Sequence, residues 1–407
     1  MALMKMKEVC SKIGSGATPR GGKEAYTNSG ISLIRSQNIL DYSFSYEGLA
    51  YINEAQAEKL RNVTVESGDV LLNITGDSVA RACMVPDELL PARVNQHVSI
   101  IRAKTDAVLS SYILYFLQMV KPHLLQLASG GATRNALTKG MIEDLVIEVP
   151  SIKEQEKTVS LIDKIQEKIK TNTTINENLE QQALALFRHY FMDFEPYGGV
   201  APSNWTEVSL DDVCARITDG SHYSPADVPD APYPMYSVKD METYGFNSSS
   251  CKHITAEEFL KMQKNDCVPR LNDILVAKDG SYLKEIFICS EEKDEAILSS
   301  IAIFRPNTEI IMPEILLYLL KQPSVRKDVG DNYVSGSALP RIVLKDFKKY
   351  TFLLPPMEEQ IKIGSVLHAI RMQTKANIDE IQSLSALRDT LLPRLMSGEL
   401  DVSCLEL

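Results

Sequence analysis

Short apolar runs rich in β-branched residues, each bounded by turn-forming residues, recur in both halves of the chain. This pattern predicts strands over the segments 31–34, 70–74, 98–101, 285–288 and 301–304. The pairs Gly68-Asp69 and Asn272-Asp273 are typical of turns that lead into strands. Two apolar stretches, 111–117 and 313–320, predict short buried helices after the strands. Both halves are therefore expected to be mixed α/β globules whose apolar segments are mainly core.

Two much longer segments have apolar residues three and four positions apart, which places one stripe along each of two helices. The first is expected over about residues 152–194 and the second after Pro355-Pro356. A helix of about 42 residues would be about 60 Å long. The first predicted stripe is Ile162, Ile165, Ile169, Asn172, Asn176, Leu179, Ala183, Leu186 and Tyr190. The second is Val366, Ile370, Thr374, Asn377, Ile381, Leu384, Arg388, Leu391 and Leu395. Asn172 and Asn377 occupy equivalent polar positions, which favour one register at a cost in stability.

The two halves repeat each other at an offset that drifts only from 203 to 205 residues. Val9-Cys10 recurs as Val213-Cys214, and Pro150 with Glu154-Gln155 recurs as Pro355 with Glu359-Gln360. A period this long indicates a duplicated domain, because solenoid repeats span only about 20–50 residues. A stretch rich in Pro, Gly and Ser, 195–204, marks the boundary between the halves. The predicted organisation is a globule over 1–150, a central helix over 151–196, a second globule over 197–355 and a distal helix over 356–407.

Composition favours an ordinary globular protein, with 44% hydrophobic and 24% charged residues. No apolar run approaches the roughly 20 residues of a membrane helix, and the first residues lack the apolar core of a signal peptide. The seven cysteines are odd in number and contain no C-x-x-C pair. We therefore expect reduced thiols in a cytoplasmic protein that does not contact a membrane.

Charge complicates any role with nucleic acid, because the net charge is -11. Residues 1–150 hold 15 Lys and Arg against 15 Asp and Glu, and residues 197–355 hold 17 against 23, so neither globule is basic. Phosphate contacts need cations. Binding to DNA would therefore require local basic faces or charge supplied by a partner.

Motifs of catalysis are nearly absent. Residues 16–23 resemble a phosphate loop, but an extra glycine precedes Lys23, and Glu24 replaces the hydroxyl residue that would hold magnesium. The amino-methyltransferase motifs Asn-Pro-Pro-Tyr and Asp-Pro-Pro-Tyr do not occur, and the six histidines do not pair at metal-ligand spacing. Asp230 with Glu291 and Lys293 fits a loose nuclease pattern, which its 60-residue gap makes a chance match. We expect no catalytic, metal or cofactor site in this chain.

Polar residues cluster near the ends of the predicted strands, where they could read base edges. Arginine can pair with guanine O6 and N7, and glutamine or asparagine with adenine N6 and N7. The candidate DNA-binding residues of the first half are Thr18, Arg20, Arg35, Gln37, Asn38, Arg81, Gln96, His97, Arg134 and Asn135. Those of the second half are Ser221, His222, Tyr223, Lys239, Lys278, Ser281, Lys284, Ser300 and Arg341. Because the scaffold repeats while these residues differ, the two halves are expected to read different sequences.

The ends of the long helices make the pattern more specific. Residues 186–196 read Leu-Phe-Arg-His-Tyr-Phe-Met-Asp-Phe-Glu-Pro, and residues 391–400 read Leu-Leu-Pro-Arg-Leu-Met-Ser-Gly-Glu-Leu. With Gly16-Ala17-Thr18-Pro19 and the repeated Pro-x-x-x-Glu-Gln, nearly the whole chain resembles the specificity subunit of type I restriction–modification systems. The resemblance implies two duplicated mixed α/β target-recognition domains separated by two long antiparallel coiled-coil helices. One departure is that the first half has no counterpart of Trp205, so the edge of the first domain is expected to pack differently.

The resemblance also implies partners. The chain would be a non-catalytic subunit that binds a bipartite, asymmetric site on double-stranded DNA, with the helix pair setting the spacer. Two modification (methyltransferase) subunits would dock on the helices, with restriction (translocase) subunits outside them, in a bacterial or archaeal cytoplasm. S-adenosylmethionine, and ATP with magnesium, would be cofactors of those partners and not of this chain.

Three alternatives follow from the residues alone. A stand-alone sequence-specific DNA-binding protein, such as a repressor, would usually be basic, which this chain is not. A coiled-coil adaptor that binds only proteins would not need two domains with dissimilar polar tips. A nuclease is disfavoured by the missing motifs.

Overall fold

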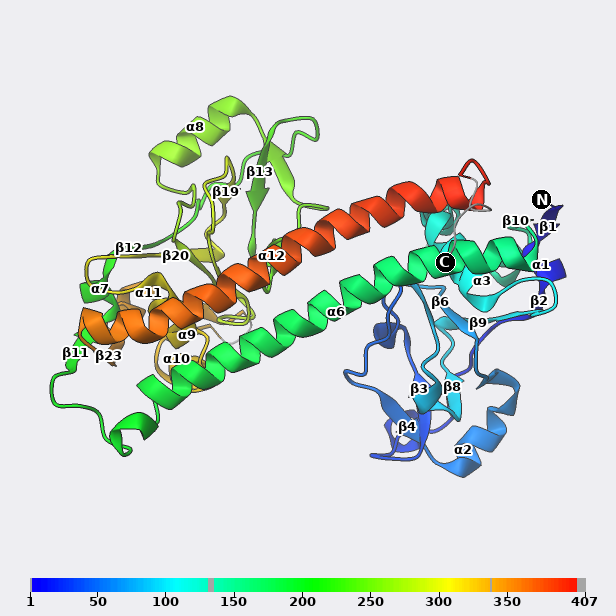
Figure 1. Cartoon of the computed structure of the whole chain (residues 1–407), viewed down its shortest axis with the longest axis horizontal. Coiled ribbons are helices and arrows are strands. Elements are labelled where there is room, and N and C mark those ends of the chain that lie inside the picture. Colours follow the sequence, from blue (N-terminus) through cyan, green and yellow to red (C-terminus); the bar gives the residue numbers. More distant parts are fainter. Residues whose placement is uncertain (1, 131–134, 337–338, 401–407) are drawn as a thin grey trace. The chain divides into compact units, whose positions relative to one another are not determined.

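The computed structural model describes residues 2–130, 135–336 and 339–400, and its two long helices are marked in Figure 1. The chain forms two compact units: unit 1 comprises residues 1–171 and 380–407, and unit 2 comprises residues 172–379. Each unit contains one mixed α/β globule and a part of both 40-residue helices, α6 (Ile152–Phe191) and α12 (Met357–Met396). The predicted fold class, two duplicated mixed α/β domains with two long helices, is confirmed.

Unit 1 is built on two four-stranded sheets. The antiparallel first sheet has the order β2 (Cys10–Ser15), β9 (Val98–Ala103), β6 (Val70–Asn73), β7 (Ala82–Met84). The mixed second sheet has the order β4 (Ala50–Ile52), β3 (Ile31–Ile34), β8 (Ala92–Val94), β5 (Thr64–Val65). β1 (Ala2–Lys5) pairs with β10 (Val146–Val149). The α-helices of this globule are α1 (Met6–Val9), α2 (Glu54–Lys59), α3 (Ser110–Met119), α4 (Lys121–Ser129) and α5 (Lys139–Glu143).

Unit 2 repeats this plan. Its four-stranded sheet has the order β12 (Cys214–Asp219), β20 (Ile301–Pro306), β17 (Ile274–Ala277), β18 (Ile286–Ile288). A three-stranded sheet has the order β16 (Lys252–Ile254), β13 (Tyr233–Tyr236), β19 (Ala296–Ile297). The remaining strand pairs are β11 (Thr206–Ser209) with β23 (Thr351–Leu354), β14 (Met241–Glu242) with β15 (Gly245–Phe246), and β21 (Val334–Ser335) with β22 (Arg341–Ile342). The α-helices are α7 (Leu210–Val213), α8 (Ala256–Lys264), α9 (Pro313–Leu320), α10 (Pro323–Asn332) and α11 (Leu344–Phe347).

The elements predicted from periodicity are present with small differences at their ends. The predicted strands correspond to β3, β6, β9, β18 and β20, and the two predicted short helices are α3 and α9. The first long helix ends at Phe191 instead of near residue 194. Gly68 and Asn272 both adopt left-handed backbone, with φ of 79° and 68°, which confirms the two turns.

The same buried ion pair follows each of these turns. Asp69 and Asp273 are both fully buried. The Arg102 guanidinium donates from Nε and Nη2 to the two carboxylate oxygens of Asp69 at 2.7 and 2.9 Å. Arg305 does the same to Asp273 at 2.8 and 2.7 Å. The duplication therefore extends to a bidentate pair that joins a turn to the neighbouring strand, β9 or β20.

The repeated Glu-Gln motif has an equally repeated structural role. Gln155 and Gln360 are buried at the start of α6 and α12. The Gln155 Nε2 donates to the carbonyls of Ala107 and Pro150 at 3.1 and 3.0 Å, and its Oε1 accepts from the Leu109 backbone at 2.9 Å. Gln360 makes the three corresponding bonds at 3.0 Å each, to Ile310, Pro355 and Met312. Each glutamine therefore ties the beginning of a long helix to the loop that leads into α3 or α9.

The glutamates of the two motifs differ, and this difference explains the departure at Trp205. Glu154 caps its own helix by accepting from the backbone and hydroxyl of Ser151 at 2.8 and 2.7 Å. Glu359 accepts instead from Tyr197, Asn204 and Trp205 at 3.1, 3.2 and 3.1 Å. The linker before β11 is thus held on the start of α12.

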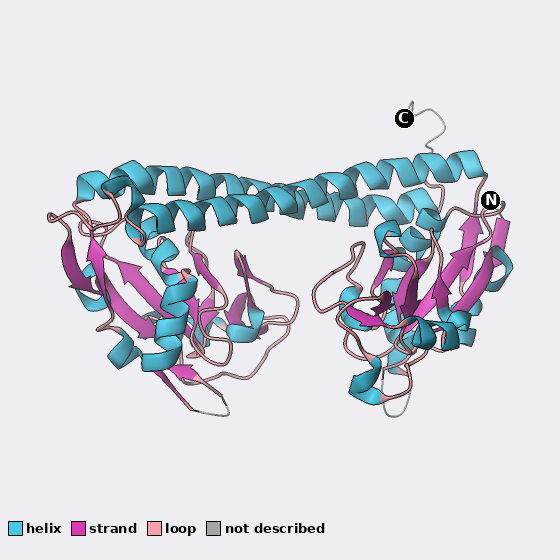
Figure 2. Ribbon diagram, turned by 90° about the horizontal axis from the view of Figure 1, so that it is seen from below, coloured by secondary structure: helices cyan, strands magenta, loops and turns pink. Residues whose placement is uncertain are grey.

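Within each unit the two long helices run antiparallel and rest on the core. In unit 1, Gln166 accepts from Arg388 at 3.2 Å and Lys168 lies 3.3 Å from Glu380. In unit 2, Asn377 Nδ2 donates to Asn176 Oδ1 at 2.7 Å. In each unit the sheets lie on one side of the helix pair (Figure 2). Ten residues of the two predicted stripes, which we expect to pair the helices and to support subunit contact, are buried or half-buried: Ile165, Ile169, Asn172, Leu179, Leu186, Ile370, Asn377, Ile381, Leu384 and Leu391.

The predicted stripe of the second long helix, α12, is wrong at its first position. Val366 is 47% exposed, whereas Leu367 beside it is fully buried. Leu367 packs into the core of unit 2, and a Cβ on nearby Gly364 would lie 2.4 Å from Met312 Sδ. The globule, not the partner helix, therefore decides which face of α12 is buried at this end.

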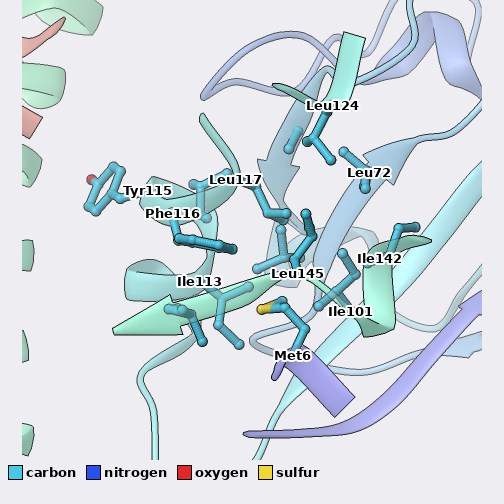
Figure 3. Close-up of a cluster of buried hydrophobic side chains, with 14 of the residues drawn as sticks. Met6, Leu72, Ile101, Ile113, Tyr115, Phe116, Leu117, Leu124, Ile142 and Leu145 are labelled. Atoms are coloured by element: carbon cyan, nitrogen blue, oxygen red, sulfur yellow. The ribbon is translucent and has the colours of Figure 1, made fainter. Parts of the chain in front are cut away.

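The main core of unit 1 lies between the first sheet and helices α3 to α5 (Figure 3). Leu72 and Ile101 come from the sheet, Phe116 and Leu124 from α3 and α4, and Ile142 from α5. Ile162 of α6 and Leu392 and Leu395 of α12 belong to the same cluster. The six cysteines among the described residues are free and buried. Among the described residues, every helix is too short or too polar to span a membrane.

Candidate nucleic-acid interface

A glycine fixes the start of the candidate site in each unit. Gly16 follows β2 and Gly220 follows β12. The Gly16 N–H donates to Val98 O at 2.8 Å, and the Gly220 N–H donates to Ile301 O at 3.1 Å. A Cβ would lie 2.1 Å from Val94 O at Gly16 and 2.3 Å from Ile297 O at Gly220, which no side chain can tolerate. Each glycine therefore lets the loop after β2 or β12 lie directly against the loop that leads into β9 or β20.

Replacing Gly16 with alanine should lower the stability of unit 1 by about 1–3 kcal/mol or more, because the clash is with backbone that cannot rotate away. The matched control is Gly14→Ala, since a Cβ at Gly14 would meet nothing within 4 Å. Urea unfolding of the full chain measures the difference. Equal stability of the two variants would contradict the close approach.

Four polar residues from three loops form one hydrogen-bonded chain at this end of unit 1. Thr18 Oγ1 donates to Gln96 Oε1, and Gln96 Nε2 lies 2.8 Å from His97 Nε2. His97 Nδ1 lies 2.6 Å from Thr75 Oγ1. Because an amide nitrogen only donates, this arrangement has Gln96 donating to His97 Nε2 and leaves the Nδ1–H of His97 to donate to Thr75 Oγ1. The Thr75 hydroxyl is then left to donate to a further acceptor.

A short polar turn after β3 or β13 adds to each site. We define the polar turns as residues 35–38 in unit 1 and 237–240 in unit 2. Arg35 and Gln37 both donate to the Gly48 carbonyl, and Gln37 is exposed. Asn38 is fully buried and donates to Ser45 O and Glu47 O at 3.0 and 3.1 Å, so its side chain shapes the turn. Asp240 is buried at the equivalent place, and its carboxylate accepts from the Ser237 backbone at 2.8 Å.

Charged side chains replace the neutral chain in unit 2. Lys278 Nζ lies 2.8 Å from Asp219 Oδ2 and 3.6 Å from Asp279 Oδ1. Arg341 Nε lies 3.7 Å from Asp279 Oδ2, and His222 Nε2 lies 3.3 Å from Asp219 Oδ1. Lys278 is buried, whereas Arg341 and His222 are exposed. The result is a network of alternating charge, Arg341–Asp279–Lys278–Asp219, with the His222 ring beside Asp219, and both Arg341 and His222 face solvent.

Of three further candidates in unit 2, two serine hydroxyls support its loops and one tyrosine is exposed. The Ser221 hydroxyl donates to Tyr223 O at 2.7 Å, and Ser221 itself is buried. Tyr223 is 61% exposed, so its ring is available to a ligand. The Ser300 hydroxyl accepts from the Val238 backbone at 3.0 Å and so connects the polar turn to the loop before β20.

The remaining candidates differ in their exposure. Arg20 and Asn135 are exposed and Arg81 is half-buried in unit 1, while Arg134 lies outside the described residues. In unit 2 the exposed residues are Lys239, Ser281 and Lys284. The backbone carbonyl of Asn135 accepts from Gly76 at 3.3 Å, which keeps it beside Thr75.

Sequence reasoning missed Thr75, Asp219 and Asp279. Thr75 and Asp279 occupy equivalent places: each precedes a glycine with positive φ, Gly76 at 79° and Gly280 at 70°. That repeated glycine is the signal that could have found them. The two sites therefore share a scaffold, with uncharged residues in unit 1 where unit 2 carries a charged network.

Comparison with known proteins agrees with this duplicated plan. A family model for the type I restriction modification DNA specificity domain matches residues 1–181 and again residues 202–384. The MjaIX type I restriction enzyme specificity subunit of Methanocaldococcus jannaschii is 25% identical over 98% of this chain and 93% of its own length. The HindI specificity subunit of Haemophilus influenzae is 23% identical over 92% and 95%.

The crystal structure of the S subunit of a type I restriction–modification system from M. genitalium shares the fold. It covers 97% of this chain and 96% of its own, with a TM-score of 0.55 at 13% identity. Because the family model spans most of the chain in two copies, the chain belongs to the type I restriction modification DNA specificity family.

Proposed function

We propose that this chain is the DNA sequence-recognition subunit of a type I restriction–modification complex. Each unit reads one half of a bipartite, asymmetric target on double-stranded DNA. The observation that carries the proposal is the pair of polar sites at the same end of two equivalent sheets, with an uncharged hydrogen-bonded chain in unit 1 and a charged network in unit 2. Two interfaces that share a backbone scaffold but carry different side chains suit the recognition of two different DNA half-sites.

The chemistry available at each site fits base edges. The amide of Gln37 can pair with adenine N6 and N7, and the Arg341 guanidinium can pair with guanine O6 and N7. The Thr75 hydroxyl, which accepts from His97, can donate to a base acceptor. Phosphate contacts would come from exposed cations such as Arg20, Lys239 and Lys284. With a net charge of -11, part of the counterion release would come from partner subunits.

The helix pair would set the spacer between the half-sites and dock two modification subunits. The buried Asn176–Asn377 amide pair in its stripe favours one register, which suits a strut of fixed length. The modification subunits would methylate adenines with S-adenosylmethionine, and restriction subunits would use ATP with magnesium. This chain would supply specificity and no catalytic group.

Genome-wide mapping of methylated adenines in the host, with and without this chain, tests the proposal. We expect one bipartite sequence to lose methylation when the chain is removed and to regain it on complementation. A methylome that does not change would contradict the proposal. Nanomolar sequence-specific binding by the purified chain alone, in a gel-shift titration, would instead favour a stand-alone DNA-binding protein.

A further inference from the structure

A tyrosine stands at the same place in each unit, at the tip of the hairpin that follows the polar turn. Tyr42 comes five residues after Gln37, and Tyr244 comes five residues after Lys239. The hairpin of unit 1 closes through a bridge between residues 39 and 44, and that of unit 2 through β14 and β15. The polar turn and the tyrosine are therefore the two ends of one small, repeated structure.

In unit 1 this tyrosine contacts the helix pair. The Arg388 guanidinium of α12 lies 4.2 Å from the centre of the Tyr42 ring, within the range of a cation–π interaction. The same arginine donates to Gln166 of α6 at 3.2 Å, so Tyr42 packs on a group that bridges both helices. Burial raises the pKa of Tyr42 to about 12, in keeping with a desolvated contact.

In unit 2 the equivalent tyrosine reaches the helix pair by different chemistry. Tyr244 Oη donates to the backbone carbonyl of Asn176 on α6 at 3.3 Å. The side chain of Asn176 accepts from Asn377 of α12, so Tyr244 also meets a residue that joins the two helices. Lys321 lies 6.0 Å from the Tyr244 ring and 2.7 Å from Glu180 of α6.

Both hairpins are anchored between their ends as well. Ile39 and Met241, the residues after the polar turns, are 0% and 6% exposed. Asn38 and Asp240 hold the turns from inside through bonds to the backbone. Within the polar turns themselves, residues 35–38 and 237–240, the exposed residues are Gln37 and Lys239. Their position therefore depends on how firmly the hairpin tip is held.

We propose that Tyr42 and Tyr244 are positioning residues that fix each polar turn to the helix pair, so that each tyrosine sets the reading of its own half-site. This inference rests on the proposed function. The equivalent tyrosines bind the helices differently, Tyr42 by a cation–π contact and Tyr244 by a hydrogen bond. In each unit the residue that the tyrosine contacts, Arg388 or Asn176, is itself hydrogen-bonded to the other long helix. The tyrosine acts through Gln37 or Lys239 and does not itself touch DNA.

Methylation kinetics of the assembled methyltransferase complex test the proposal. Three duplexes are needed: the target, and the target with one base changed in either half-site. Tyr42→Ala should lower kcat/KM on the target by about 2- to 30-fold, through KM with kcat unchanged. It should also weaken discrimination at one half-site only. Tyr244→Ala should weaken discrimination at the other half-site, so each variant is the control for its counterpart.

Conservative variants separate positioning from general damage. Tyr42→Phe keeps the ring on Arg388 and should behave as wild type, whereas Tyr244→Phe loses its hydroxyl bond and should be impaired. Arg388→Gln should reproduce Tyr42→Ala, and the double variant should be no worse than the worse single one. Equal loss at both half-sites, or a lowered Tm with unchanged discrimination, would overturn the inference. A wild-type complex that methylates no bipartite sequence would refute the proposed function itself, independently of any variant.

Discussion

Three extra heptads in each long helix should move the methylated half-sites about nine base pairs further apart without changing their sequences. Twenty-one residues lengthen a helix by about 31 Å, and B-DNA rises about 3.4 Å per base pair. This shift is close to one turn of about 10 base pairs, so both half-sites stay near the same face of the DNA. Whole heptads also keep the phase of the buried stripe.

The structure gives the insertion points. Insertion between Thr171 and Asn172 and between Asp379 and Glu380 follows the boundary of the two compact units. It preserves the Gln166–Arg388 pair in unit 1 and the Asn176–Asn377 pair in unit 2. Sequencing of the sites methylated by the variant complex gives the new spacer.

Two controls accompany this variant. The same insertion in α6 alone should abolish methylation, because the helices would no longer match in length. Twenty-one residues between Gly199 and Val200, in the exposed linker, should leave the spacer unchanged. An active double-insertion variant with the original spacer would show that another part of the complex measures the gap.

Replacing Asp69 with alanine should destabilise unit 1 by about 3–5 kcal/mol, because Arg102 would lose its buried partner. The Arg102 side chain is 21% exposed, and its other carboxylate partner, Glu66, is at the surface. Asp273→Ala should have a similar effect on unit 2, where the pair with Arg305 has nearly the same geometry. Urea or thermal unfolding of the full chain measures both losses.

The double variant Asp69→Leu with Arg102→Met should recover much of the stability, since it removes the unpaired charge together with its partner. The matched surface control is Asp211→Ala, whose carboxylate is 65% exposed and lies 3.5 Å from Lys348. It should change stability little. If Asp69→Ala unfolded like this control, the buried pair would contribute nothing to the fold.

Hydrophobic periodicity was sufficient to predict the buried side chains of an element wherever that element packs against a single surface along its length. The strands β3, β6 and β9 and the central part of both helix stripes follow this rule, from Ile165 to Leu186 and from Ile370 to Leu391. The rule failed at Val366, because the start of α12 packs on the core of unit 2 and its buried face turns to Leu367. A stripe alone does not reveal a change of partner along a helix.

The candidate site was harder to predict because hydrogen bonds, not burial patterns, arrange it. Nothing in the residue type of Asn38 distinguishes an amide that supports a turn from one that faces a ligand. Asp219 and Asp279 were overlooked because acidic residues do not suggest contact with DNA, yet they hold Lys278 and Arg341. The repeat was the best guide, since equivalent positions such as Asn38 and Asp240 have equivalent roles.

The buried glutamines at the start of α6 and α12 have a consequence for inheritance. Gln155 and Gln360 close their domains with the same three hydrogen bonds. A crossover between related genes at either glutamine codon would join a foreign domain to a resident helix in register. New combinations of two recognition domains could then arise in a single recombination event, without a series of point mutations through unstable intermediates.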